Sequence, residues 1–284
     1  MMTIDIICPL YRGSEFIVPL YKSLKSQKKV NINNILFILT DTNDDSENIL
    51  KYNNIQYVKI DKKDFSHSQT REKYALQSNS DIVTFITQDV IIEDELWLYH
   101  LTKNIISGNC QAAFSRQITK YNNIEKYTRE KNYPECSRIV SKRDIEKLGL
   151  YTFFFSDASG AIKLDVFKKI NGYDNKKLPI SEDMYFAYKL VMNGFRIAYE
   201  ADSIVYHSHN FKLKELYNRY KLTGKFFKQN SYLDQYGTNK TGSGMAKYIL
   251  KRSIEDKNIK VIIRIPFDLV ARFVGMKVGK YGEK

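Results

Sequence analysis

The fold of this chain is decided by residues 65–94, which read FSHSQTREKYALQSNSDIVTFITQDVIIED. A polar loop leads into a helix-forming stretch, then into the apolar run Ile82–Ile86, and then into Thr87-Gln88-Asp89. A short apolar run between polar flanks is typical of a buried strand. In open α/β sheets, ligands bind just beyond the carboxyl ends of the strands, which is where Asp89 is expected. The segment therefore predicts an α/β fold with a ligand site at this sheet edge.

The same alternation of apolar runs and helical spacing extends toward the N-terminus. Strands are expected at residues 4–8, 35–39 and 55–60, and helical spacing runs from Phe16 to Ser26. Strands that alternate with helices and end in polar loops indicate a doubly wound, mostly parallel sheet flanked by helices. Asp41 follows the second strand as Asp89 follows the fourth, so both carboxylates are expected at one edge of the sheet.

Beyond Asp89 we expect further helices and short strands. The helices are expected at residues 96–106, 165–170 and 181–192, and the strands at residues 112–118, 153–155, 161–162, 197–199 and 204–206. Residues 119–150 are polar with few apolar runs, which favours a mobile insertion or lid. Ser181 is expected to cap the helix that opens with Glu182 and Asp183, and the helix dipole is expected to keep Asp183 ionised.

The last third of the chain is far more basic than the rest. Residues 207–284 hold 17 Lys and Arg against 6 Asp and Glu, whereas residues 1–206 hold 28 against 26. A basic region on a near-neutral body indicates an anionic partner, either nucleic acid or an anionic membrane surface. We therefore divide the chain into a ligand-binding domain, residues 1–210, and a basic, amphipathic helical region, residues 211–284.

Within the basic region, a helix is expected at residues 213–227, followed by a Gly-, Thr- and Asn-rich loop at residues 234–244. In residues 259–276, charges recur at every fourth position: Lys260, Arg264, Asp268 and Arg272. Such a stripe opposite a broad apolar face favours a helix in a membrane interface, and the alternative is a helix packed on the core. Pro266 is expected to break or kink this segment, or to start its second half.

Cysteine content and hydropathy exclude several classes of protein. Cys8, Cys110 and Cys136 are scattered without a CxxC pair, which argues against a disulfide framework or structural zinc and fits a reducing cytosol. The chain has no apolar run of about 18 residues, so no conventional membrane-spanning helix is expected. The N-terminal segment is too short and charged for a signal peptide. A soluble or peripheral protein is expected.

Acidic and imidazole side chains recur at the expected strand ends and helix starts: Asp41, Asp89, Glu182, Asp183, His207 and His209. One cleft at the carboxyl edge of the sheet would collect them from several loops. Asp89 and a histidine of the His207–His209 turn suit a divalent metal, and Asp183 suits a general base. Plainer readings stay open, in which Asp89 opens a turn, Glu182 and Asp183 cap a helix, and the histidines are structural.

These segments together resemble family 2 inverting glycosyltransferases of the GT-A fold, and among them the bacterial rhamnosyltransferase-like branch. The resemblance covers about residues 3–230 and is carried by residues 4–27, 38–49, 65–98, 153–174 and 180–220. It implies a GT-A domain over residues 1–210. It also implies a nucleotide-sugar donor that contacts Pro9, Tyr11, Asp41, His67, Arg71, Gln88 and Asp89.

The resemblance further implies the catalytic roles. Gln88-Asp89 stands where the family has Asp-x-Asp, with Thr87 in place of the first Asp, so a weakly bound Mg²⁺ or Mn²⁺ is expected on Asp89. His207, with His209 as a close second, matches the imidazole near that metal. Asp183, beside Glu182, matches the base that deprotonates the acceptor hydroxyl, and Asp157 and Ser159 are assigned to the acceptor.

In this branch the donor is typically dTDP-L-rhamnose and the acceptor a glycan on a polyprenyl diphosphate, used in bacterial surface polysaccharide synthesis. The resemblance thus implies a cytoplasmic protein, monomer or homodimer, peripherally bound to the anionic inner face of the bacterial cell membrane. A UDP-hexose or UDP-N-acetylhexosamine donor stays an alternative, as does a non-catalytic sugar-nucleotide-binding protein. Nucleic-acid binding by the aromatic, basic helix is a further alternative, but no nucleic acid is expected because no such module is recognisable.

Overall fold

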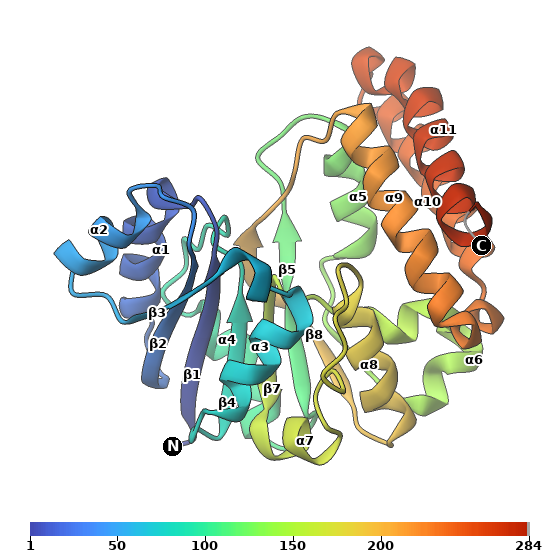
Figure 1. Cartoon of the computed structure of the whole chain (residues 1–284). Coiled ribbons are helices and arrows are strands. Elements are labelled where there is room, and N and C mark those ends of the chain that lie inside the picture. The colour runs from blue at the N-terminus through green and yellow to red at the C-terminus, as the bar shows by residue number, and fades with distance from the viewer. Residues whose placement is uncertain (283–284) are drawn as a thin grey trace.

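A single mixed sheet forms the centre of the computed structural model, which describes residues 1–282 apart from the side chains of residues 238–241. Its eight strands have the order β3-β2-β1-β4-β7-β5-β8-β6 (Figure 1). The strands are β1 (Thr3–Leu10), β2 (Asn31–Thr40), β3 (Tyr57–Ile60), β4 (Ile82–Ile86), β5 (Ala112–Ile118), β6 (Arg138–Val140), β7 (Ser159–Lys163) and β8 (Ile197–Tyr206). All except β7 and β6 run in one direction, so the predicted mostly parallel sheet is confirmed.

Helices cover both faces of this sheet (Figure 1). They are α1 (Ser14–Lys25), α2 (Ser46–Tyr52), α3 (His67–Leu76), α4 (Trp97–Ile106), α5 (Ile124–Asn132), α6 (Ile145–Leu148), α7 (Leu164–Lys169), α8 (Glu182–Met192), α9 (Leu213–Gln229), α10 (Thr238–Glu255) and α11 (Ile259–Tyr281). Strand β4 is buried on both sides: Ile82 and Ile86 face the core under α1 and α4, and Val83 and Phe85 face the core under α7 and α8. Burial on both faces explains why its sequence is continuously apolar rather than alternating.

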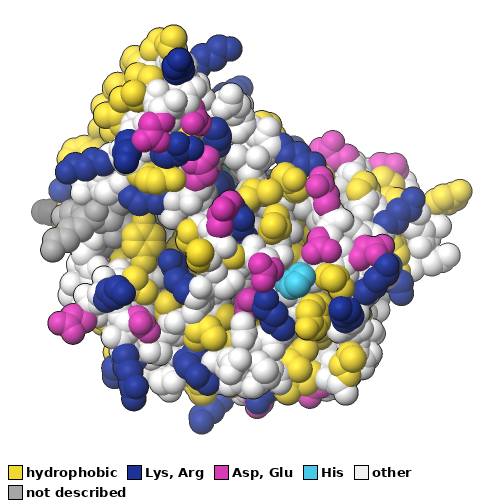
Figure 2. All heavy atoms as spheres, turned by 180° about the vertical axis from the view of Figure 1, so that it is seen from behind, with side chains coloured by type: hydrophobic (Ala, Val, Ile, Leu, Met, Phe, Trp, Pro, Cys, Tyr) yellow, Lys and Arg dark blue, Asp and Glu magenta, His cyan; other side chains and the backbone are white. Residues whose placement is uncertain are grey.

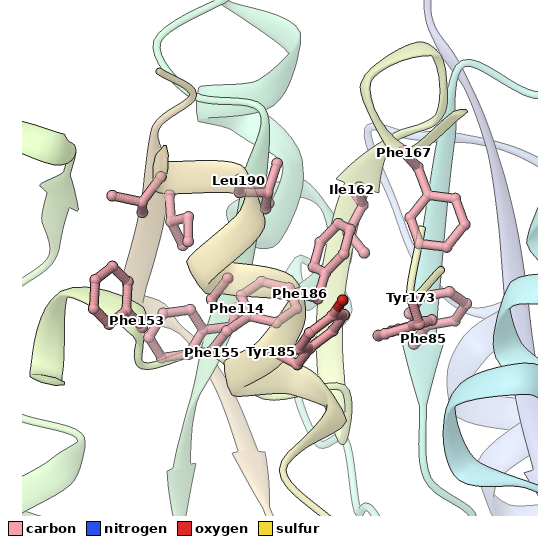
Figure 3. Close-up of a cluster of buried hydrophobic side chains, with 14 of the residues drawn as sticks. Phe85, Phe114, Phe153, Phe155, Ile162, Phe167, Tyr173, Tyr185, Phe186 and Leu190 are labelled. Carbon is pink, nitrogen blue, oxygen red and sulfur yellow. The ribbon is translucent and has the colours of Figure 1, made fainter. Parts of the chain in front are cut away.

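An aromatic cluster ties β4 to the start of the acidic helix α8 (Figure 3). The ring of Phe85 lies 6.2 Å from that of Phe167 and 6.5 Å from that of Tyr173. Phe186 of α8 lies 5.3 Å from Phe167 and 5.4 Å from Tyr173. Aromatic pairs at such separations each add about 0.5–1.5 kcal/mol beyond area burial. The cluster therefore fixes the first turn of α8 relative to the carboxyl end of β4.

The segment expected as a mobile lid is instead folded. Residues 119–150 contain α5, the edge strand β6 paired with β8, and α6. Its apolar residues are few but large, because Tyr127 is fully buried and Tyr133 packs in the core. The prediction was wrong because two buried tyrosines and several ion pairs hold a segment that shows little hydrophobic periodicity.

Other strand predictions need smaller corrections. Residues 149–153 form a 3₁₀ helix, and Phe155 packs into the core, so the strand expected at residues 153–155 is absent from the described chain. The two strands expected at residues 197–199 and 204–206 are one strand, β8, whose pairing with β5 shifts register after Ser115.

The basic C-terminal region is helical throughout most of its length. The loop expected at residues 234–244 is a 3₁₀ turn followed by α10, and α11 continues through Pro266. Helices α9 and α11 pack closely because Gly224, Gly275 and Gly279 lie at their contact; a Cβ on Gly275 would lie 2.5 Å from the Tyr217 carbonyl oxygen. None of the described helices is long and apolar enough to cross a membrane.

The charged stripe of α11 faces the protein. Arg264 pairs with the buried Asp268 at 2.6 Å and donates to the Phe211 carbonyl, and Arg272 contacts Tyr220 of α9. The stripe therefore anchors α11 on its neighbours, and it is the apolar side of this helix that meets solvent. The division at residue 210 stays a prediction, and residues 283 and 284 lie outside the described residues.

Candidate active site

A pocket of about 560 Å³ opens at the carboxyl edge of the sheet. Its floor comes from the ends of β4 and β8 and from residues 154–158, its sides from α3 and the start of α8, and its roof from α5, α9 and Arg272 of α11. Segments far apart in the chain thus meet around one space, as expected for a parallel sheet whose loops gather at one edge.

Three side chains in this pocket form a group suited to a divalent metal. One ligand atom each of Asp89, His207 and His209 lie within 4.8 Å of one another. The Asp89 carboxylate lies 3.6 Å from His207 Nε2 and 3.8 Å from His209 Nδ1. Mixed imidazole and carboxylate donors fit Mn²⁺ or another first-row cation, and Mg²⁺ through its carboxylate preference. These are the three residues that the sequence analysis assigned to the metal.

The environment of His207 prepares it for this role. Its Nδ1 lies 2.9 Å from the Gln117 side-chain oxygen, which Arg129 also contacts. An N–H on Nδ1 directed at this oxygen leaves the Nε2 lone pair facing Asp89 and the pocket. Burial, reinforced by the charge of Arg129, lowers the pKa of His207 well below its usual value, so the ring is neutral and able to bind a cation.

Thr87 and Gln88 do not add a second carboxylate to this group. The Thr87 hydroxyl lines the pocket and has no hydrogen-bond partner in the described part of the chain. Gln88 turns away: its side chain accepts from the Tyr11 N–H at 2.7 Å and donates to the Tyr11 carbonyl at 2.9 Å. Gly13 makes room for it, because a Cβ there would lie 2.6 Å from the Gln88 oxygen. Gln88 therefore positions the loop after β1.

The residues expected to hold the nucleotide lie farther along the same edge. Pro9 and Tyr11 are at the end of β1, and Asp41 follows β2, where its carboxylate lies 3.3 Å from Lys59. Among the described residues that line the 560 Å³ pocket, none of these three occurs. They stay candidates for a base and ribose site next to the pocket.

Beneath the pocket, one buried arginine meets a group of acids. Arg71 is 2% exposed and donates to Glu182 at 3.2 Å and to the His67 carbonyl at 2.9 Å. Asp157, also 2% exposed, accepts from Tyr173 at 2.7 Å through one oxygen, and its other oxygen has no partner among the described residues. Burial raises the pKa of Asp157 to about 7, although Arg71 opposes the shift. Arg71 is therefore a buried, paired residue and not a solvated surface charge.

Asp183 faces the pocket from the first turn of α8. Burial raises its pKa well above the usual aspartate value, and the charges of Glu182 and Asp157 add to this effect. The expectation that the helix dipole dominates is wrong, because desolvation and two neighbouring acids outweigh it. The cap prediction is also wrong: Ser181 has a left-handed φ of 59° and makes no side-chain cap bond. A carboxylate with a raised pKa is a stronger base than an ordinary aspartate, which suits it to accepting a proton.

Ser159 does not reach the pocket. It is fully buried in β7, and its hydroxyl lies 2.6 Å from that of Ser115. Ser115 in turn contacts Ser203 and Trp97, so Ser159 belongs to a structural network under the sheet edge. The acceptor assignment of Ser159 is therefore withdrawn, whereas Asp157 lines the pocket.

Several pocket residues were missed by the sequence analysis, among them Gln117, Arg129 and Arg219. Gln117 lies in a strand predicted correctly, and its polar side chain near the strand end was an available signal. Arg129 belongs to α5, which was read as part of a lid. Arg219 was read only as one charge of a basic helix.

Comparison with known proteins gives the chain a family. Residues 5–170 match the family model for glycosyl transferase family 2. The chain is 28% identical to the O-antigen chain rhamnosyltransferase RfbN of Salmonella typhimurium, over 99% of this chain and 90% of that protein. It is 31% identical to the O-antigen chain rhamnosyltransferase WbaN of Salmonella anatum, over 90% of this chain and 82% of that protein.

Solved structures agree on the fold. The mannosyltransferase PcManGT of Pyrobaculum calidifontis, solved with GDP-Man and Mn²⁺, superposes with a TM-score of 0.65 at 11% identity, covering 99% of this chain and 88% of that one. TarS of S. aureus, residues 1–349, superposes with a TM-score of 0.56 at 15% identity, covering 99% and 92%. At these identities the likeness supports the GT-A architecture.

Replacing Asp89 tests the metal group directly. Asp89→Asn keeps the shape of the side chain but removes its charge, so the affinity for Mn²⁺ is expected to fall at least about tenfold. Isothermal titration of the nucleotide-free protein with Mn²⁺ measures this. Asp41→Asn is the matched control, because it neutralises a carboxylate that follows β2, a strand separated from β4 by β1, and should leave Mn²⁺ binding unchanged. Equal affinities of wild type and Asp89→Asn would contradict the assignment.

Replacing Arg71 tests the buried acids through pH. Asp157 titrates near 3.8 when unfolded and at about 7 when folded, so the folded chain binds more protons between these values. The free energy of unfolding contributed by Asp157 thus falls as pH rises through this window, and Arg71 limits the fall. Arg71→Met is expected to cost about 3–5 kcal/mol near pH 8 and clearly less near pH 5, where Asp157 is neutral. Urea unfolding of the wild type and Arg71→Met at both pH values measures these losses. An equal loss of unfolding free energy at about pH 5 and about pH 8 would contradict the prediction.

Proposed function

The chain belongs to glycosyl transferase family 2, and from that premise we propose that it transfers L-rhamnose from dTDP-L-rhamnose to a hydroxyl of a lipid-linked glycan during bacterial O-antigen synthesis. The observation that carries the proposal is one pocket holding both the Asp89, His207 and His209 group and the raised-pKa carboxylate of Asp183. The rhamnosyl assignment is supported by two relatives that align over most of the chain.

The metal-ligand group serves the leaving nucleotide. Asp89, His207 and His209 would hold Mg²⁺ or Mn²⁺, and the PcManGT structure contains Mn²⁺ beside its nucleotide sugar. When bound, the cation offsets the negative charge that develops on the departing diphosphate. Gln117 and Arg129 keep His207 oriented with its free lone pair toward this position. With Thr87 in place of a second carboxylate, the cation is expected to bind weakly.

Asp183 serves the acceptor. Its carboxylate takes the proton of the acceptor hydroxyl while the hydroxyl oxygen forms a bond to the anomeric carbon. The bond from that carbon to the diphosphate oxygen breaks, and its electron pair leaves with the nucleotide. Because the attack occurs opposite the leaving group in one displacement, the anomeric configuration inverts. Arg71 and Glu182 hold the first turn of α8, and with it Asp183, under the sugar.

Substitution of Asp183 separates catalysis from binding. Asp183→Asn is expected to lower kcat about 10²–10⁴-fold by removing the base, while the Kd for the donor changes little. Asp165→Asn, at the exposed first turn of α7, is the matched control and should keep full activity. Transfer is measured by nucleotide release with a polyprenyl-diphosphate-linked glycan, and donor binding by calorimetry. Full activity of Asp183→Asn would exclude it as the base.

The donor is tested with the same assay over a panel of dTDP-L-rhamnose, UDP-hexoses and UDP-N-acetylhexosamines. Transfer from dTDP-L-rhamnose alone is the expected outcome. Transfer from a UDP-sugar would overturn the rhamnosyl assignment and keep the mechanism. If the protein binds donors but transfers no sugar to any acceptor, the non-catalytic alternative is favoured.

We further propose that α11 seats the protein on an anionic membrane. Its outward side carries exposed apolar residues over its whole length: Ile259, Ile263, Phe267, Val270, Phe273 and Val274. Figure 2 shows such side chains gathered with lysines and arginines at the upper left, over the C-terminal helices. A contiguous apolar stripe beside basic residues suits the boundary between lipid headgroups and acyl chains, and each nearby Lys or Arg adds about 1 kcal/mol on an anionic surface.

Vesicle binding tests this surface. Phe273→Asp places a charge within the stripe, near its C-terminal end, where Phe273 is 65% exposed, and is expected to weaken binding to vesicles rich in phosphatidylglycerol about tenfold or more. Tyr52→Asp is the control, because Tyr52 is 88% exposed at the end of α2. Co-sedimentation measures both variants. Unchanged binding of Phe273→Asp, or no binding by the wild type, would contradict the proposal.

A further inference from the structure

We infer that Arg219 of α9 binds the diphosphate of the donor and of the leaving nucleotide, and supplies positive charge that the incomplete metal site lacks. This rests on the proposed function, and it assigns a role to a residue outside the metal group and the buried acids. The inference stands on three observations: the ion pairs of the pocket arginines, a row of ring contacts, and a threonine hydroxyl that has no partner among the described residues.

Arg219 differs from the other arginines of the pocket in having no acid partner. The pocket is lined by Arg71, Arg129, Arg219 and Arg272. Arg71 lies 3.2 Å from Glu182, while Arg129 and Arg272 lie 3.6 Å and 3.9 Å from Glu125. In the described chain, no carboxylate lies within 4.0 Å of Arg219 and no hydrogen bond holds its guanidinium. A cation that faces a pocket without a counter-charge is suited to an anionic ligand.

A row of ring contacts links Arg219 to the metal-ligand group. Its guanidinium lies over the Phe211 ring at 5.5 Å, and Phe211 lies 5.0 Å from the His209 ring. His209 in turn lies 4.9 Å from the His207 ring. Arg219 therefore lines the same pocket as the proposed ligands of the cation, and Phe211 lies between it and His209.

Thr87 gives the reason why extra charge is needed there. It occupies the place of an acid beside Asp89, and its buried hydroxyl has no partner among the described residues. With one carboxylate instead of two, the group offers less negative charge to Mg²⁺ or Mn²⁺, cations that prefer carboxylate oxygens. An arginine is always charged and presents several N–H donors to phosphate oxygens. Arg219 would thus stabilise the diphosphate both before and after the bond to the sugar breaks.

The face of α9 that carries Arg219 is turned to the pocket along two turns. Leu216, Tyr220 and Thr223 line the pocket together with Arg219, at the spacing of one helix face. Close packing of α9 on α11 through Gly224, Gly275 and Gly279 fixes the rotation of this helix. The position of Arg219 is therefore set by the fold, although its side chain is exposed.

The test compares a nucleoside diphosphate with the matching monophosphate. Arg219→Gln is expected to weaken dTDP binding about tenfold to hundredfold, with little change for dTMP, because only the diphosphate carries the contacted group. Calorimetry is run with Mn²⁺ and again with EDTA, and the loss is expected in both. Lys214→Gln, which removes an exposed charge from the same helix, should change neither affinity. Arg219→Lys should restore part of the dTDP affinity, since it keeps the charge but not the planar donors.

The outcomes separate this inference from the proposed function. If the wild type binds no nucleotide at all, the proposed function fails. If it binds UDP instead of dTDP, the donor assignment fails and the comparison is repeated with UDP and UMP. If the wild type binds and Arg219→Gln keeps the same diphosphate-to-monophosphate ratio, the inference is overturned. A raised KM for the lipid acceptor with unchanged dTDP binding would also overturn it, and would assign Arg219 to the acceptor.

Discussion

Arg71 carries its charge into the interior of the protein, where it meets Glu182 directly and acts on the charges of Asp157 and Asp183. A buried arginine is stable only when its acidic partners are held in place, because an unpaired buried charge costs several kcal/mol. α3 supplies the arginine and α8 supplies the glutamate. Between them, Glu72 of α3 accepts the backbone N–H groups of Tyr173 and Asn175. The loop before α8 is thereby fastened to the helix that holds Arg71.

The buried group of Arg71 and its acids also sets the proton affinity of the carboxylates in the pocket. Burial raises the pKa values of Asp157 and Asp183, and the neighbouring charge of Glu182 adds to both shifts. Asp157 accepts a hydrogen bond from the Tyr173 hydroxyl. Among the described residues, Asp183 accepts a hydrogen bond from the Met184 N–H alone, and it faces the pocket. The protein thus keeps one carboxylate of raised basicity beside a space large enough for a sugar. Elsewhere in the pocket, Asp89 contributes a carboxylate and His207 and His209 contribute imidazoles to the metal-ligand group.

Much of the fold follows from local pattern, and the errors have a common physical cause. β4 and β5 begin and end where periodicity predicts, because both are buried runs with few alternative pairings. α5 and α10 were missed because their sequences carry few apolar residues and owe their order to tertiary contacts, such as Tyr127 packed among Ile249, Val261 and Ile265. For the site, the strand-end acids and the histidines were foreseeable from position. Ser159 was misassigned because the sequence does not say which side of β7 is covered by other elements. Arg219 could not be singled out from the sequence, because only the fold shows which arginines pair with acids.

The two sides of α11 connect the pocket to the surface. Arg272 on its inner side lines the pocket and contacts Tyr220, while Phe267 and Val270 on its outer side form an apolar groove with Leu213 and Tyr217 of α9. A lipid-linked glycan joins a polar sugar chain to an apolar tail, so an enzyme that uses it needs a polar pocket and an apolar surface close together. One helix that carries both meets this requirement without crossing the membrane. On the proposed function, the close glycine packing of α9 and α11 therefore serves two purposes, since it sets the depth of the pocket roof and the orientation of the surface on which the acceptor arrives.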